Sequence, residues 1–257
     1  MIIQYMKQYI AFYIVFLVAI ILGVAFYGSS RAFKQSFLQL LTASETNTVL
    51  TSDDDNYYQT FTPTDLSVRN VDSVEEYVDK IKNVGIDTNE DLLTKINTSI
   101  NKINSHFKDD DTFYGMDMNV WKQIPWKIGV FNGVEYESGL PHTRNDVILL
   151  PLSLLYSKQL TKVLVHEKTH VYQKLYPEKI RPYISKHYKV HSKKADVRTA
   201  RANPDVDKYI YSDYNGTIYS ANYASNPKDM FDIQYAKGDK EYEHPYENMA
   251  YSLEKKI

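Results

Sequence analysis

The chain has 257 residues, of which 43% are hydrophobic, and its formal net charge is −2. This length and composition suffice for one large domain or for a domain with appendages. The near balance of charge argues against a nucleic-acid partner and against a disordered acidic chain. There are no cysteines, which excludes disulfide frameworks, thiolate metal sites and cysteine nucleophiles.

The N-terminal region, residues 1–34, is predicted to be a membrane anchor. The stretch 9–27 reads YIAFYIVFLVAIILGVAFY, and no charged residue occurs between Lys7 and Arg31. As a helix it would rise roughly 28 Å, about the thickness of the hydrocarbon core of a bilayer. Cleavage as a signal peptide near Ala25 is the alternative, but the apolar run exceeds the usual signal-peptide core. We therefore expect a single-pass membrane protein, with an orientation that the similar flanking charges leave undetermined.

The next segments are predicted to connect the anchor to the body of the protein. Residues 35–70 have weak periodicity and are expected to be a tether. Residues 71–111 are expected to form a helical hairpin, because apolar residues recur at helical spacing over 71–84 and over 89–107, with a break at 85–87. Apolar stripes of this kind are usually core faces, so we expect a packing role.

Residues 112–257 are predicted to form one domain in which short strands are mixed with helices. The expected elements are a strand over 121–131 that ends at Asn132-Gly133, a strand over 146–151, a helix over 154–176, a hairpin over 209–223 around Asn215-Gly216, and a helix over 246–255 opened by Pro245. Helices followed by strands mixed with helices indicate an α+β fold, here with a small mixed sheet.

The predicted helix over 154–176 carries a metal-binding pattern, His166-Glu167-Lys168-Thr169-His170. Histidines four residues apart project from one face of a helix, and their nitrogens suit two corners of a tetrahedral zinc site. Glu167 is displaced round the helix, so it cannot complete that tetrahedron, but it can reach a water in the open position of the metal. The alternative is an exposed helix with two incidental histidines, and the apolar stripe around the motif counts against it.

With this motif the chain resembles the zincin metallopeptidases, and the likeness extends over about residues 120–257. The resemblance implies a zincin-like domain in which His166 and His170 bind zinc and Glu167 acts as general base and proton shuttle. It also implies an edge strand beside the cleft, for which the run 146–151 is the candidate. The wider sequence around the motif is also similar to zincin-like membrane proteins of large DNA viruses.

The third protein ligand decides the subfamily. A metzincin has glycine and histidine at the third and sixth positions after the second histidine, but this chain has Gln173 and Tyr176 there. A thermolysin-like arrangement would place a glutamate shortly downstream, but residues 179–195 contain no acidic residue. The remaining candidates are Asp196, Asp205, Glu241, Glu243, Glu247, His191 and His244.

Glu247 is the preferred third ligand. It follows Pro245 in the predicted terminal helix, and the small side chain of Ala250 would allow this helix to approach the histidines closely. Zinc sites with two histidines commonly take a carboxylate as the third protein ligand. The chain resembles gluzincin-like families here, which show a glutamate on a second helix followed by alanine at the same spacing. A plain surface carboxylate is the alternative for Glu247.

The resemblance implies a zinc-dependent peptidase that hydrolyses a peptide or protein substrate, and the predicted N-terminal anchor would place it at a membrane. Glu167 would take the proton of a zinc-activated water. A donor to the carbonyl oxygen is expected, with Tyr246 as the first candidate and Tyr242, Tyr251 and His142 as others. The alternative function is a non-catalytic membrane or virion-envelope protein that retains a zincin-like fold for binding. A structural zinc site is disfavoured, because such sites take four protein ligands and prefer cysteine.

Three further features have both a structural and a functional interpretation. Residues 179–201 are strongly basic, with Asp196 as the lone acid, which usually indicates a solvated face. An anionic membrane surface or an acidic substrate is the functional alternative. His142 lies just before the expected edge strand, as a structural histidine or at the border of the cleft. Asp205 is a turn former or a group that orients a metal ligand.

Overall fold

The fold is built on a mixed β-sheet and a helix packed against it, in the part of the chain that the computed structural model describes, residues 38–257. The helices are α2 (Ala43–Thr51), α3 (Pro63–Val68), α4 (Val74–Ile81), α5 (Glu90–His106), α6 (Met118–Gln123), α7 (Leu160–Leu175), α8 (Pro177–His187) and α9 (Pro245–Glu254). The strands are β1 (Leu38–Leu40), β2 (Gly85–Ile86), β3 (Thr112–Phe113), β4 (Met116–Asp117), β5 (Trp126–Phe131), β6 (His142–Arg144), β7 (Val147–Pro151), β8 (Tyr188–Lys193), β9 (Tyr209–Asp213), β10 (Ile218–Tyr219), β11 (Ala221–Tyr223) and β12 (Ile233–Tyr235). Short 3-10 helices lie between them, η1 (Tyr58–Thr60), η2 (Glu137–Gly139), η3 (Leu152–Tyr156), η4 (Lys194–Asp196), η5 (Ala236–Gly238) and η6 (Lys240–Tyr242).

The central sheet has the strand order β1-β5-β7-β6, and β2 pairs with the far end of β5. Strands β1, β5 and β7 run parallel, whereas β2 and β6 are antiparallel to their neighbours. The run 146–151, expected as the edge strand, is β7 and lies inside the sheet. All five residues of β7 are buried, as a strand with neighbours on both sides requires. The edge strand beside it is β6, so His142 stands on the edge strand itself.

Side chains of β5 alternate between two hydrophobic clusters, one on each face of the sheet. Trp126, Ile128 and Val130 join the cluster formed with α5, α6 and α7, and Phe131 joins the cluster formed with α2 and α4. This alternation is the period of two that a strand imposes. Gly129 allows α2 to approach, since a Cβ there would lie 2.9 Å from the hydroxyl of Thr46.

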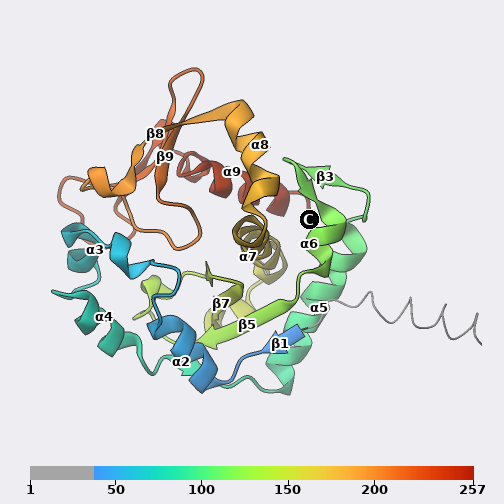
Figure 1. Cartoon of the computed structure of the whole chain (residues 1–257). Helices are drawn as coiled ribbons and strands as arrows, with labels where there is room; N and C mark the ends of the chain where they lie inside the picture. Colours follow the sequence, from blue (N-terminus) through green and yellow to red (C-terminus); the bar gives the residue numbers. More distant parts are fainter. Residues whose placement is uncertain (1–37) are drawn as a thin grey trace, which may run out of the picture. The chain divides into compact units, whose positions relative to one another are not determined.

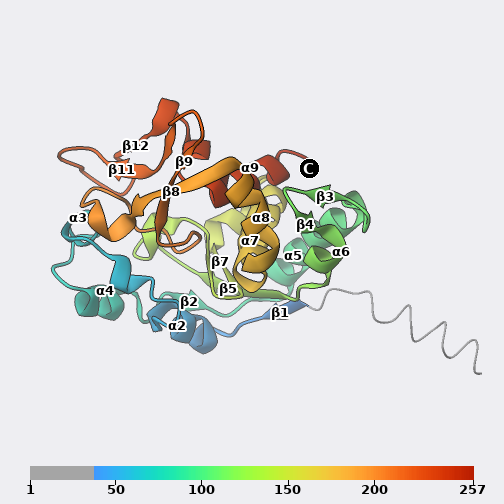
Figure 2. The ribbon, with the colours of Figure 1, turned by 45° about the horizontal axis from the view of Figure 1, so that its top comes forward.

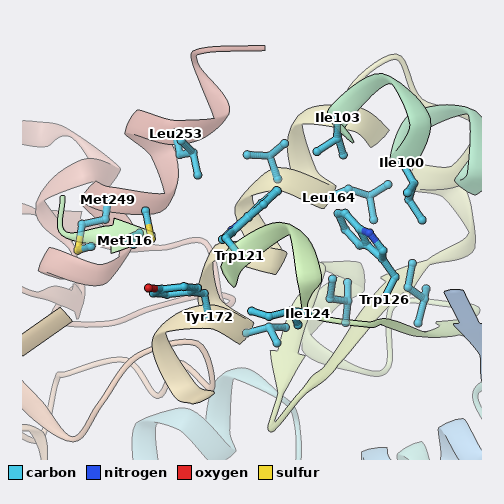
Figure 3. Packing of buried hydrophobic residues seen from close by; sticks show 14 of the residues in the cluster. Ile100, Ile103, Met116, Trp121, Ile124, Trp126, Leu164, Tyr172, Met249 and Leu253 are labelled. Carbon is cyan, nitrogen blue, oxygen red and sulfur yellow. The ribbon is translucent and has the colours of Figure 1, made fainter. Parts of the chain in front are cut away.

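The larger cluster fixes the position of α7. Figure 1 shows α7 in the centre, with β5 and β7 on one side and α9 on the other. Leu164 of α7 packs in this cluster with Trp126 of β5 and Met249 of α9 (Figure 3). Lys168 of α7 is also buried, where its ammonium lies 3.8 Å from the centre of the Trp126 ring and donates to the carbonyl of Ile124 (2.9 Å). Contacts on several sides of α7 therefore set the direction in which its functional side chains point.

Two N-terminal regions differ from the sequence-based expectation, one in its secondary structure and the other in the partners against which its helices pack. Residues 38–70, expected as a tether, contain β1, α2 and α3, and both helices begin with a capping box. The helices expected over 71–84 and 89–107 are α4 and α5, with β2 between them on the sheet. They pack against different partners, α4 against α2 and α5 against α7.

Local turn signals were correct in one case and misleading in another. The hairpin expected over 209–223 is formed by β9 and β10, in which Tyr211 pairs with Tyr219. The strand expected over 121–131 is divided between α6 and β5, and β5 pairs with the parallel strands β1 and β7 instead of continuing into a hairpin at 132–133.

The predicted architecture is corrected at its N-terminus. The expected anchor, residues 1–34, lies outside the described residues, and no helix within 38–257 is both long and apolar enough to cross a membrane. The longest of these helices, α5, has 17 residues. The described residues therefore give no support to the expected transmembrane helix and single-pass membrane location.

Candidate metal centre

Two histidines on α7 face α9. His166 and His170 are one helical turn apart, both side chains are buried, and their Nε2 atoms are 3.0 Å apart. Two ring nitrogens this close need a shared proton or a shared cation between them, because two lone pairs, or two N–H groups, would repel each other.

The start of α9 brings Glu247 to the histidines. Pro245 occupies the first turn, where its fixed φ suits a helix, and the ring of His244 accepts a hydrogen bond from the amide of Tyr246 (3.1 Å). Ala250, one turn after Glu247, is fully buried. Its small side chain lets α9 lie close to α7, with the carboxylate of Glu247 near the Nε2 atoms of both rings.

Three ligand atoms converge at this point. Oε2 of Glu247 lies 3.2 Å from Nε2 of His166 and 3.6 Å from Nε2 of His170. Atoms bound to zinc tetrahedrally, with bonds of about 2.0–2.1 Å, would lie about 3.3 Å from one another. The observed distances bracket that value, so these side chains form a group that could hold a metal ion.

The other nitrogen of each histidine is bonded to an acceptor. Nδ1 of His166 lies 3.1 Å from Oε2 of Glu254, and Nδ1 of His170 lies 2.8 Å from Oε1 of Gln173. The amide of Gln173 in turn donates to the carbonyl of Tyr246 (3.1 Å). Because both partners accept, each Nδ1 carries a proton, and in a neutral ring the lone pair of Nε2 would then be available to a shared cation at the centre of the group.

The carboxylate of Glu247 is oriented in the same way. Its Oε1 accepts from Nδ2 of Asn203 (2.8 Å), which leaves Oε2 directed at the histidines. The same amide nitrogen donates to Oε1 of Glu243 (2.9 Å), and Glu243 also binds Nη2 of Arg201 (2.7 Å). Glu243 is therefore neutralised by Arg201, whereas Glu247 is paired with the histidines.

Electrostatics favour an ionised Glu247. Burial alone would raise its pKa, but the charges and hydrogen bonds of His170 and His166 hold the pKa well below its usual range. Burial likewise opposes the charged form of His166, yet the hydrogen bonds to Glu247 and Glu254 outweigh it and raise the pKa of His166. Glu247 and His166 thus stabilise each other's charged form against the cost of burial.

Glu167 lines the same cleft as His166 and Glu247 but is not part of the group of three ligand candidates. Its side chain is buried, and its Oε2 accepts a hydrogen bond from the hydroxyl of Thr143 on β6 (3.0 Å). Burial, together with the charge of Asp205, raises the pKa of Glu167 to about 7. A carboxylate with this pKa can take up and return a proton near neutral pH.

His142, also on β6, presents a ring nitrogen with no partner. Its Nδ1 lies 3.1 Å from Oδ2 of Asp205, whose Oδ1 accepts from the amide of Thr143 (2.6 Å). The Nε2 of His142 is buried and has no hydrogen-bond partner among residues 38–257. Buried polar atoms without a partner are rare, so this nitrogen is a candidate to meet a ligand.

One cleft of about 470 Å³ connects these groups. Its lining includes His142, His166, Glu167 and Glu247, together with residues of β12. Glu167 and His142 are therefore accessible from the same space as two of the three metal-ligand candidates.

The other sequence candidates have different surroundings. Among the alternative third ligands, Asp205 binds His142, Glu243 binds Arg201, Glu241 pairs with Lys255, His244 pairs with Asp207, and His191 and Asp196 are exposed. Tyr246 does not line the cleft, because its ring packs against His244 at 4.8 Å between centroids. Tyr242 packs against Tyr219, whereas Tyr251 lines the cleft with its ring 4.6 Å from that of His166.

Sequence reasoning did not identify the residues that orient the ligands. Gln173 stands three positions after His170, on the same helix face, and this spacing could have indicated the contact. Glu254, Asn203 and Thr143 come from other elements, so no spacing in the sequence points to them.

No family model, curated protein or solved structure matches this chain. The geometry and chemistry of the site are therefore the basis on which its function can be inferred.

Proposed function

We propose that the chain is a zinc-dependent peptidase of the zincin type, in which His166, His170 and Glu247 hold the ion. The observation that carries this proposal is the set of three distances between the ligand atoms, 3.0, 3.2 and 3.6 Å. Two neutral histidines and one carboxylate leave one position of a tetrahedron open, which is the arrangement of catalytic zinc sites.

The residues around the ion supply the proton transfers. Bound zinc would lower the pKa of a water in its open position and polarise the carbonyl that this water attacks. Glu167, with a pKa of about 7, would take the proton of the attacking water and return it to the leaving amine. The hydroxyl of Thr143 holds Oε2 of Glu167, so that the other oxygen is available for the proton.

His142 is the best-placed donor to the carbonyl oxygen. Its Nε2 has no partner within 38–257, and its ring lines the cleft. The carboxylate of Asp205 holds the ring through Nδ1, so a proton on Nε2 would be the one donated to developing negative charge. In this role His142 replaces Tyr246, whose ring is held against His244 away from the cleft.

A catalytic role is favoured over binding alone. A protein that only binds a partner gains nothing from a buried carboxylate that lines the same cleft as the candidate metal ligands and is held by the hydroxyl of Thr143. A general base requires such a placement.

The test combines metal analysis with hydrolysis of a broad peptide mixture by the full-length chain. The wild type is expected to bind zinc and to hydrolyse peptides, and His170→Ala and Glu247→Ala should lose both properties. Glu167→Gln should retain zinc and lose hydrolysis. Glu178→Gln, at an exposed position of α8, is the control and should change neither. A wild type without zinc would contradict the metal site, and an active Glu167→Gln variant would contradict the proposed base.

A further inference from the structure

The edge strand β6 is closed to backbone pairing at its middle residue. The amide of Thr143 donates to Oδ1 of Asp205 (2.6 Å), and its carbonyl accepts from the ammonium of Lys174. Pro141, which also lines the cleft just before β6, has no N–H to offer. A peptide that adds to a sheet edge needs free N–H and C=O groups along that edge. A ligand in the cleft must therefore be recognised mainly by side-chain contacts.

A second wall of the cleft offers such contacts. It belongs to the hairpin of β11 and β12, at the upper left in Figure 2. Ile233 and Tyr235 both line the cleft, while Gln234 between them is exposed, in keeping with the alternation of side chains along a strand. Phe231, just before β12, also lines the cleft. These three residues, Phe231, Ile233 and Tyr235, are here named the β12 wall.

The β12 wall lines the same cleft as the candidate metal ligands His166 and Glu247. Tyr235 is partly buried within it. Phe231, in contrast, is 58% exposed, so it lies where a ligand would enter.

The exposed ring of Phe231 stands on a fixed support. Its neighbour Met230 is buried in a small cluster with Tyr223, whose hydroxyl donates to the buried carboxylate of Asp65 (2.9 Å). The amide of Ile233 donates to the carbonyl of Phe231 (2.7 Å). Covering a large apolar side chain that is held in water is favourable for binding. Because the backbone here is already ordered, little conformational entropy is lost when a ligand binds.

We propose that the β12 wall selects peptides that carry a large apolar side chain next to the bond to be cut. The inference rests on the proposed peptidase function and adds its substrate class. Ile233 and Tyr235 would receive the side chain nearest the metal ligands, and Phe231 would cover it from the mouth of the cleft. Polar side chains of the same size would lose their hydration against the apolar surfaces of Phe231 and Ile233, which offer no hydrogen bond in return.

The experiment measures binding and cleavage separately, with the full-length chain. Binding uses the Glu167→Gln variant and fluorescent peptides that differ at a single position, which holds phenylalanine, leucine, alanine or aspartate. Cleavage uses the wild type and a peptide mixture whose products are sequenced by mass spectrometry. We expect the apolar peptides to bind about tenfold or more tightly than the alanine peptide, and cleavage to occur beside the same residues.

Variants of Phe231 test the wall itself. Phe231→Ala should remove most of the tenfold preference, and Phe231→Leu should retain it, because leucine preserves the apolar contact. Tyr156→Ala is the matched control, since Tyr156 is an aromatic residue, 64% exposed, that does not line the cleft. It should leave the preference unchanged.

The outcomes separate this inference from the proposed function. Equal binding of apolar and alanine peptides, or an unchanged preference in Phe231→Ala, would overturn the role of the β12 wall. A binding preference that depends on Phe231, in a wild type that cleaves no peptide, would support the wall and reject the peptidase. Cleavage without preference for apolar residues would support the peptidase and reject the wall.

Discussion

Asn203 and Glu247 are joined by a hydrogen bond of 2.8 Å, from Nδ2 of the amide to Oε1 of the carboxylate. This bond fixes which oxygen of Glu247 faces the histidines. It also ties the loop before β9 to α9, because the Oδ1 of Asn203 accepts from the amide of Asp205 (2.8 Å). The orientation of the third ligand therefore depends on a side chain that does not itself face the ion.

Replacing Asn203 by alanine is expected to weaken zinc binding by about 10- to 100-fold, because Glu247 loses the group that orients it. The measurement is competition for zinc against a chelator of known affinity. Asn119→Ala, at an exposed position of α6, is the control. An unchanged zinc affinity in Asn203→Ala would show that the hydrogen bond does not orient the ligand.

Glu254→Gln tests the partner of His166. The carboxylate at 3.1 Å from Nδ1 increases the basicity of the ring and fixes its proton, and an amide does both less well. We expect zinc affinity to fall by about tenfold, less than in Glu247→Ala, which removes a ligand. Glu75→Gln, on the exposed surface of α4, should bind zinc as the wild type does. A loss in Glu254→Gln as large as in Glu247→Ala would argue for a direct ligand role of Glu254.

His142→Ala is expected to lower kcat by about 100- to 1000-fold, the usual effect of removing one donor to developing negative charge. Zinc affinity and KM should change little, because His142 contacts neither the ion ligands nor the ground-state substrate strongly. Steady-state kinetics and metal analysis together check this. His191→Ala removes an exposed histidine and should retain full activity. A His142→Ala variant with normal kcat would leave another group as the donor.

The sequence predicted those parts of the site that depend on local spacing. His166, Glu167 and His170 share one helix, so the period of α7 was sufficient to place them together. Glu247 could be proposed because acids are scarce after His170 and because Pro245 marks a helix start. The structure brings these ligand candidates together, with Glu247 at 3.2 and 3.6 Å from the two histidines.

The rest of the site depends on contacts between distant segments. Thr143 reaches Glu167, and Asp205 reaches His142, only because β6 pairs with β7 and lies beside α7. The edge strand was misassigned for a related reason. An apolar run such as 146–151 indicates a buried strand. The sequence of the run does not show which other strands will pair with it.

A buried ion pair between Arg69 and Glu137 makes stability depend on pH in acid. Nη2 of Arg69 lies 2.6 Å from Oε2 of Glu137, and the hydroxyl of Tyr77 donates to Oε1 (2.7 Å). Burial alone would raise the pKa of Glu137, but the charge and hydrogen bonds of Arg69, with Tyr77, bring it down from 4.5 to about 2. Because the folded-state pKa is lowered, the pair stabilises the fold above pH 4.5, and this stabilisation is lost as the pH falls toward 2.

Glu137→Gln is therefore expected to lower the free energy of unfolding by about 1.5–3 kcal/mol at neutral pH, the usual value of a hydrogen bond to a charged group. It removes the nearer of the two carboxylates that pair with buried Arg69, and Asp65, 3.3 Å from Nη1, remains. Near pH 2, where Glu137 of the wild type becomes protonated, the difference should be much smaller. Urea unfolding at several pH values measures both. Glu135→Gln, two residues away and exposed, should follow the wild-type curve. A difference that stays constant with pH would contradict the pairing.

The closed edge of β6 has a consequence for association between copies of the chain. An edge strand with free N–H and C=O groups can pair with a strand of a neighbouring molecule, so that one sheet extends through both molecules. At Thr143 these groups are already bonded to Asp205 and Lys174. Asp205 thus has two roles. It binds His142 in the cleft, and by occupying the amide of Thr143 it hinders aggregation through the β6 edge of the sheet.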